Sequence, residues 1–350
     1  MNLMARNSVW SMPDRTSRTD ASGRDTGIDT MRGIAILMVI GIHSLQQPLN
    51  SWGIPADAAL RPCVPIFLFA SGYLTARTGR VALGRRLRAA LIPYAIAFVA
   101  AYIYMARHNP AMDHRIVTTV ARFVLAYAFV YYYVFVYVGC TLGLWLMFSV
   151  TGPGEPRSDA KLVALLLLWI ALGLIAGSYL DPLLSRLGFA DSTIEEVRMR
   201  DIPFWFSFMA LGSLVGLSGS NSRLHEIRGL ISAATLLAFI IYAAVRLFGI
   251  GDAADYDSVA FFGYAALLCV LLLALEVRSP LVAALGSGSY FIYLWHIFIV
   301  MILRDHAALH RFGPLAYFAI TFAAATLGSI VALLAIRATA PPNIIRWLGA

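Results

Sequence analysis

Long apolar segments recur along almost the whole chain and limit its fold more than any other feature. A helix needs about 17–25 mostly apolar residues to span a bilayer, because each residue adds about 1.5 Å across a hydrocarbon core about 30 Å thick. Backbone groups in lipid must pair within a helix or around a closed barrel, and long unbroken apolar runs exclude the barrel. The sequence therefore predicts an all-α, polytopic integral membrane protein with about ten transmembrane helices. The predicted segments are 33–50, 62–76, 89–106, 117–150, 161–180, 202–218, 229–247, 258–276, 286–303 and 314–336.

The overall composition supports this assignment. Hydrophobic residues make up 60% of the 350 residues and charged residues only 13%. A typical soluble domain is about 45–50% apolar and about 25% charged. Because a water-soluble core could not bury this much apolar surface, lipid must cover the rest. Cys63, Cys140 and Cys269 all fall in apolar segments, which predicts buried thiols and no disulfide framework.

The predicted segment 117–150 is too long for one simple span. It could form one tilted helix with an extension along the membrane surface, a span with a re-entrant piece, or two short helices. Its tyrosine run, Tyr131-Tyr132-Tyr133, is typical of the aromatic belt at a membrane surface.

Charged residues in the connections predict the orientation. The connection between the second and third segments has several arginines and no acidic residue, whereas 181–201 and 249–257 are acidic. Since arginines near span ends mark the cytoplasmic side, we expect both termini to be cytoplasmic. The polar residues 1–27 contain no signal-peptide apolar region and predict a disordered cytoplasmic tail. A transmembrane domain would follow over 28–340, and 341–350 would form a short cytoplasmic tail.

Two histidines are the main titratable residues inside the predicted transmembrane segments. His43 lies eleven residues after Arg32, about 16 Å along a helix and therefore near the bilayer midplane. His296 lies about eight residues after Gly288, on a span that runs in the same direction. Either could be a packing residue, but at one depth the two could face one cavity. Histidine titrates near neutral pH, which suits proton transfer.

Two further features have both a functional and a structural interpretation. Pro65 and the pair Ser71-Gly72 could kink the second span and admit a ligand, or could simply form a notch for helix packing. The arginine cluster orients the chain, and its guanidinium groups could also bind the phosphates of a cytosolic donor or anionic lipid headgroups. That cluster consists of Arg85, Arg86 and Arg88. His306 and His310 have i,i+4 spacing but no carboxylate or thiolate to complete a metal site, so we predict no metal.

Four short motifs, in this order, resemble those of the membrane-bound acyltransferase family 3. Residues 29–43 resemble its R-x2-A-x3-V-x3-H opening, and 65–74 resemble its apolar F-x-x-S-G-[FY] motif. Residues 85–88, followed by Pro93-Tyr94, resemble the R-x-x-R loop and the P-Y start of span three. Residues 289–296 are similar to the Y-x-x-Y-L-x-H segment. The resemblance covers essentially 28–340.

The resemblance implies roles for the candidate residues. His43, with Arg32, would be essential to acyl transfer, and Arg85, Arg86 and Arg88 would bind the acyl donor. His43 would act as general base or accept the acyl group transiently. His296 would orient the acceptor or share proton handling, and Ser71 would hydrogen-bond the substrate or the histidine. The fused extracytoplasmic domain of many members is absent, so the resemblance leaves the acceptor undefined.

The resulting functional hypothesis is a membrane O-acyltransferase of the bacterial inner membrane. It would transfer an acyl group, in the first instance acetyl, from acyl-CoA to a sugar hydroxyl of a surface polysaccharide or lipid-linked glycan. Acetyl-CoA would be a co-substrate, and no tightly bound cofactor and no nucleic acid would be involved. Membrane lipids would be the other partners. The alternative is a transporter or flippase for lipid-linked sugars. Such proteins often contain internal repeats or carboxylates inside spans, and the predicted spans contain neither.

Overall fold

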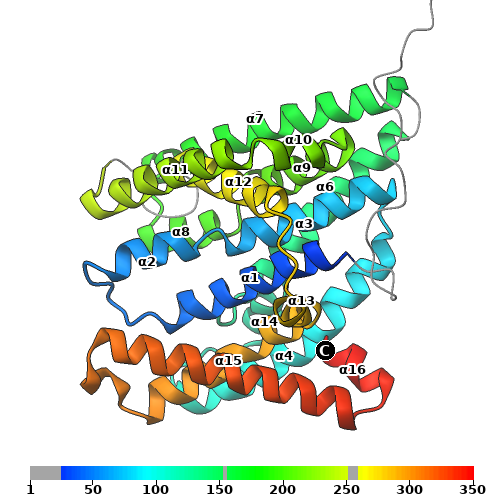
Figure 1. Ribbon diagram of the computed structural model, residues 1–350. Helices are drawn as coiled ribbons and strands as arrows, with labels where there is room; N and C mark the ends of the chain where they lie inside the picture. The colour runs from blue at the N-terminus through cyan, green and yellow to red at the C-terminus, as the bar shows by residue number, and fades with distance from the viewer. Residues whose placement is uncertain (1–24, 153–155, 251–258) are drawn as a thin grey trace, which may run out of the picture.

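The computed structural model describes residues 25–152, 156–250 and 259–350, and their regular structure is helical. The helices run mostly along one direction, and α1 lies between a layer that contains α3 and α9 and a layer that contains α14 and α15 (Figure 1). The helices are α1 (Thr26–Ser44), α2 (Gly53–Leu60), α3 (Cys63–Thr78), α4 (Leu83–His108), α5 (Ile116–Val124), α6 (Tyr132–Thr151), α7 (Pro156–Arg186), α8 (Asp191–Met199), α9 (Ile202–Ser218), α10 (Asn221–Glu226), α11 (Arg228–Phe248), α12 (Val259–Ala274), α13 (Pro280–Ser287), α14 (Ser289–His306), the short 3-10 helix η1 (Leu309–Phe312), α15 (Pro314–Thr339) and α16 (Pro342–Leu348).

The predicted all-α membrane fold is confirmed. In the described ranges, eight helices are long and apolar enough to cross a membrane, and α13 with α14 makes a ninth if this pair, bent by 80°, is one span. The apolar helix α12 is shorter and corresponds to the predicted segment 258–276. The total of ten spans therefore stays a prediction. Cys63, Cys140 and Cys269 are buried free thiols.

The long predicted segment 117–150 divides into one span and one short helix. The nine-residue α5 ends at Val124, and the 20-residue α6 begins at Tyr132. Between them, Ala126 and Phe129 have φ values of 50°, which an α-helix cannot contain. The aromatic-belt interpretation of residues 131–133 is wrong, because all three tyrosines are buried.

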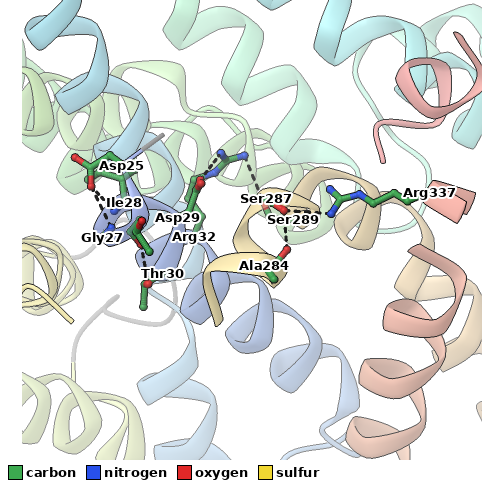
Figure 2. Close-up of polar contacts among 11 residues, drawn as sticks. Asp25, Gly27, Ile28, Asp29, Thr30, Arg32, Ala284, Ser287, Ser289 and Arg337 are labelled. Atoms are coloured by element: carbon green, nitrogen blue, oxygen red, sulfur yellow. Dashed lines mark hydrogen bonds and ion pairs between the residues drawn. The ribbon is translucent and has the colours of Figure 1, made fainter. Parts of the chain in front are cut away.

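Helix α1 is displaced toward the N-terminus relative to the predicted span 33–50. The Asp25 carboxylate accepts hydrogen bonds from the backbone N–H groups of Gly27 and Ile28 (Figure 2), and this N-cap starts the helix at Thr26. The helix ends at Ser44, so Arg32 lies inside it and His43 lies in its last turn. Of the predicted disordered tail 1–27, only 25–27 belong to the described residues.

Glycines set the distance between α3 and α9. A Cβ atom at Gly72 would overlap the carbonyl oxygen of Met209, and one at Gly212 would overlap that of Phe69. The packing interpretation of Gly72 is therefore correct. Pro65 lies in the first turn of α3, where its missing N–H is tolerated, and the helix runs from Cys63 to Thr78.

The two ends of the described chain lie at one end of the bundle (Figure 1). Asp25 forms an ion pair with Arg77 in the last turn of α3, with an N–O distance of 3.6 Å. Gly349 lies against Tyr290 and Pro93. This end also carries the arginine cluster, as the predicted orientation requires. Which side of a membrane it faces stays a prediction.

The predicted acidic connection 181–201 is mostly helical. Helix α7 continues to Arg186, and α8 follows. The Asp181 carboxylate pairs with Arg198, and Glu196 pairs with Arg200, so part of its negative charge is neutralised internally. In the other acidic connection, 249–257, residues 251–257 lie outside the described residues.

Candidate active site

A cavity of about 670 Å³ opens at the end of the bundle that carries the arginine cluster. Its volume lies in the range of about 300–1,000 Å³ that is usual for small-molecule sites. It brings together five of the seven site residues predicted from the sequence, namely Arg32, Ser71, Arg85, Arg86 and Arg88. Other polar side chains on its surface are Tyr133, Tyr137, Ser289, Tyr290, Tyr293, Arg346 and Trp347.

The arginine cluster belongs to the first two turns of α4 rather than to a loop. Arg85 and Arg88 are three residues apart and therefore share one face of the helix. The N-terminus of a helix carries a partial positive charge that favours anions and disfavours cations. Three guanidinium groups at this position concentrate positive charge, which an anionic ligand would neutralise. None of the described residues that line the cavity is Asp or Glu.

Arg32 links α1 to the start of α14. Its Nη2 donates a hydrogen bond of 3.2 Å to the hydroxyl of Ser289, which is buried (Figure 2). Its Nη1 lies 3.5 Å from a carboxylate oxygen of Asp29, one turn earlier in α1. These contacts hold the guanidinium group at the cavity while leaving its side chain 32% exposed.

The structure also brings the two predicted histidines together. The ring centroids of His43 and His296 are 5.5 Å apart. His296 is fully buried, whereas His43 is partly exposed. The Nδ1 atom of His296 lies 2.9 Å from the carbonyl oxygens of both Ile292 and Tyr293. Because carbonyl oxygens only accept hydrogen bonds, Nδ1 carries the proton and Nε2 has a lone pair.

The Nε2 atom of His296 is buried and has no hydrogen-bond partner among the described residues. A buried acceptor without a partner is costly and is typical of a site that a ligand or a catalytic proton completes. This arrangement gives the neutral imidazole a fixed orientation and a basic nitrogen.

Neither histidine belongs to the lining of the arginine cavity, which Tyr293 separates from them. Tyr293 lines the cavity, and its ring centroid lies 6.5 Å from that of His296. Its hydroxyl donates a 2.6 Å hydrogen bond to the carbonyl oxygen of Val130. The ring of Tyr133 lies 5.4 Å from that of Tyr293. One aromatic layer therefore lies between the arginines and the histidine pair.

A buried ion cluster near the histidines was missed in the sequence. Asp57 in α2 pairs with Arg61 at 2.6 Å and with Arg246 of α11, and all three side chains are at most 11% exposed. Helix α2 packs against α1, the helix that carries His43. The candidate span Gly53–Thr78 begins earlier than the predicted segment 62–76, so Asp57 lies in its first two turns and not in a connection. The i,i+4 spacing of Asp57 and Arg61 was the available signal.

These features define a multi-pass helical membrane protein with a cationic cavity at one end of its bundle. The model of acyltransferase family 3, described as an acyltransferase domain, matches residues 25–334. Because the match spans most of the 350 residues, the chain belongs to this family and is a membrane acyltransferase. No curated protein and no solved structure matches the chain.

Proposed function

We propose that this acyltransferase acts on sugars, transferring acetyl from acetyl-CoA to a hydroxyl of a surface polysaccharide or lipid-linked glycan at a bacterial inner membrane. The observation that carries the proposal is the arginine-lined cavity, one aromatic layer away from a pair of neighbouring imidazoles. The first element suits a polyanionic donor, and the second suits proton transfer to and from an alcohol.

The donor would enter from the cytoplasmic end. Arg85 and Arg88, on one face of α4, would bind the diphosphate of CoA bidentately, and Arg86 would add charge beside them. The pantetheine arm would extend toward Tyr293 and the histidines. Acetyl-CoA would leave as CoA after each turnover, so it is a co-substrate and not a resident cofactor.

The transfer itself would need one base. The sugar oxygen attacks the thioester carbonyl carbon, a C–O bond forms, the C–S bond breaks, and the hydroxyl proton passes through an imidazole to the departing CoA thiolate. His43 is proposed as that base, because it is the partly exposed member of the histidine pair. In the alternative order of events, its nitrogen accepts the acetyl group first and the sugar then takes it.

The neighbouring residues would orient this chemistry. His296, with its Nδ1 proton held by two carbonyl oxygens, presents its Nε2 lone pair to accept a proton or an acceptor hydroxyl. Arg32 lines the arginine cavity, about 16 Å along α1 from His43, and would contact the donor away from the reacting carbonyl. Ser71 lines the same cavity and would hydrogen-bond the pantetheine arm or the thioester.

The acceptor would reach the histidines from the opposite half of the membrane. The segment 181–201 is a candidate for contact with the acceptor there. Asp191 and Glu195 of this segment are exposed. Mass spectrometry of surface glycans from a deletion strain would identify the acceptor, because a lost acyl mass reports both the group and its carrier.

Purified protein tests the proposal directly. We expect acceptor-dependent release of free thiol from acetyl-CoA, together with incorporation of radiolabelled acetyl into glycan. A transporter would move lipid-linked sugar without either signal. The buried Asp57 resembles the intramembrane carboxylates of transporters, but two arginines neutralise it. Transport of the glycan without thiol release would overturn the proposed function.

A further inference from the structure

The C-terminal helix α16 completes one side of the arginine-lined cavity, although it lies beyond residues 25–334 that match the family. Figure 1 shows α16 folded back beside the start of α4. Gly349 contacts Tyr290 and Pro93, which fixes the end of the chain against both α14 and α4. The predicted short tail 341–350 is therefore a docked part of the site.

Two side chains of this segment face the ligand space. Arg346 and Trp347 both line the cavity. Both are solvent-exposed, and the Trp347 side chain is 51% exposed. Tyr293, at the other side of the cavity lining, is only 5% exposed. The exposed pair therefore lies at the mouth, and the deep end lies toward the histidines.

The charge at the cavity exceeds what one diphosphate needs. Arg346 adds a fifth guanidinium group to those of α1 and α4, and no Asp or Glu lines the cavity in the described ranges. The Nη1 atom of Arg86 is buried and has no hydrogen-bond partner among the described residues. This N–H group of Arg86 is therefore available to donate a hydrogen bond to a ligand. Acyl-CoA carries a diphosphate and a separate 3′-phosphate, both attached to the ribose that also bears adenine.

We propose that α16 binds the nucleotide end of the acyl-CoA donor. Arg346 pairs with a phosphate of the 3′-phosphorylated ADP group, and the indole of Trp347 stacks on the adenine ring. Base–aromatic stacking and charge-assisted hydrogen bonds are the two interactions that this exposed Arg-Trp pair offers. The assignment rests on the proposed donor and explains why a short helix outside the matched domain closes this cavity.

Donor preference tests the assignment. The full chain in zwitterionic nanodiscs is assayed with acetyl-CoA and with S-acetylpantetheine, which lacks the nucleotide. We expect Arg346→Ala and Trp347→Ala each to lower the ratio of kcat/KM for acetyl-CoA over S-acetylpantetheine about tenfold. Arg223→Ala is the matched control, because it removes an exposed arginine of α10 that is not among the lining residues; its ratio should equal that of the wild type.

Equal losses with both donors in either variant would show a structural role and overturn the assignment. An unchanged ratio in both variants would also overturn it, even if Arg85→Ala still weakens the use of acetyl-CoA. The proposed function fails in a different way, namely when wild-type protein releases no thiol from either donor.

Anionic lipid headgroups offer the same phosphate chemistry, and direct binding separates the two sources. Equilibrium binding of radiolabelled CoA is measured in nanodiscs with and without phosphatidylglycerol. We expect Arg346→Ala to raise the Kd for CoA about tenfold in both, and 3′-dephospho-CoA to bind the wild type more weakly than CoA. A CoA affinity that Arg346→Ala leaves unchanged, with weaker retention of phosphatidylglycerol, would assign Arg346 to lipid and overturn the proposal.

Discussion

The arginine-lined cavity and a buried polar centre elsewhere in the bundle use arginine side chains in opposite ways. In the cavity, arginines of α1, α4 and α16 meet in a space whose described lining contains no Asp or Glu. In the polar centre, which consists of Asp57, Arg61 and Arg246, the two arginines share one carboxylate. The first region thus leaves its positive charge to a ligand, whereas the second compensates most of its charge internally. We infer that binding energy comes from the cavity, and that a rigid environment for proton transfer comes from the polar centre.

Removal of the proposed base gives the largest expected effect. His43→Ala should lower acetyl transfer about 10²–10⁴-fold, the usual contribution of a positioned general base. The Kd for CoA should stay at the wild-type value, because His43 is not part of the cavity lining. Incorporation of radiolabelled acetyl into glycan, at equal protein level, measures the first quantity. Undiminished labelling would remove His43 from the mechanism.

Asp57→Asn tests whether the polar centre is compensated internally. It leaves two buried guanidinium groups with less negative charge, and breaking a buried pair costs about 3–5 kcal/mol. We expect a large fall in thermal stability of the detergent-solubilised protein. Glu226→Gln is the control, because Glu226 is exposed at the end of α10. Equal stability of the two variants would show that Asp57 contributes no net stabilisation.

The cavity arginines should affect affinity and leave the fold intact. Arg85→Ala or Arg88→Ala should raise the KM for acetyl-CoA about 10–100-fold, because each removes a charge-assisted contact worth about 1.5–3 kcal/mol. Arg80→Ala is the matched control. Arg80 is exposed in the connection between α3 and α4, just before the arginine cluster, but does not line the cavity. A KM that changes equally in all three variants would indicate general loss of positive charge instead of a defined site.

Tyr293→Phe gives the smallest expected effect and tests the aromatic layer between the cavity and the histidine pair. It removes the hydrogen bond to the carbonyl oxygen of Val130 but keeps the ring in place. The loss should be about 0.5–1.5 kcal/mol in the free energy of unfolding, with little change in kcat. Chemical unfolding followed by tryptophan fluorescence measures the first quantity. A fall in kcat of the size seen with His43→Ala would instead make the Tyr293 hydroxyl a participant in the reaction.

Several parts of the site could be predicted because they depend on local spacing. His43 follows Arg32 by eleven residues, and a fixed rise per residue converts that count into about 16 Å along the helix, which brings His43 into the last turn of α1. His296 lies seven residues after Ser289, the first residue of α14, and its ring is a neighbour of the His43 ring. Arg85 and Arg88 share a helix face for the same reason.

Other parts required knowledge of distant partners. The tyrosines of residues 131–133 have the composition of an aromatic belt, yet their helix packs in the interior and Tyr133 lines the cavity. Asp57 has a local partner in Arg61, but its second partner, Arg246, is 189 residues away. No local pattern reports which helices lie side by side.

The sequence alone determined that the chain is an all-helical membrane protein, because the length and hydropathy of each segment decide whether it can satisfy its backbone in lipid. It also predicted which histidines and arginines would carry the chemistry. The tertiary structure decided which of these residues lie close together. It also showed that α1 begins at Thr26, after the N-cap Asp25, and that the last residues line the arginine cavity. Those outcomes depend on close packing between segments far apart in the chain. Glycines such as Gly72 and Gly212 permit this packing, but the sequence does not show which helix lies against each glycine.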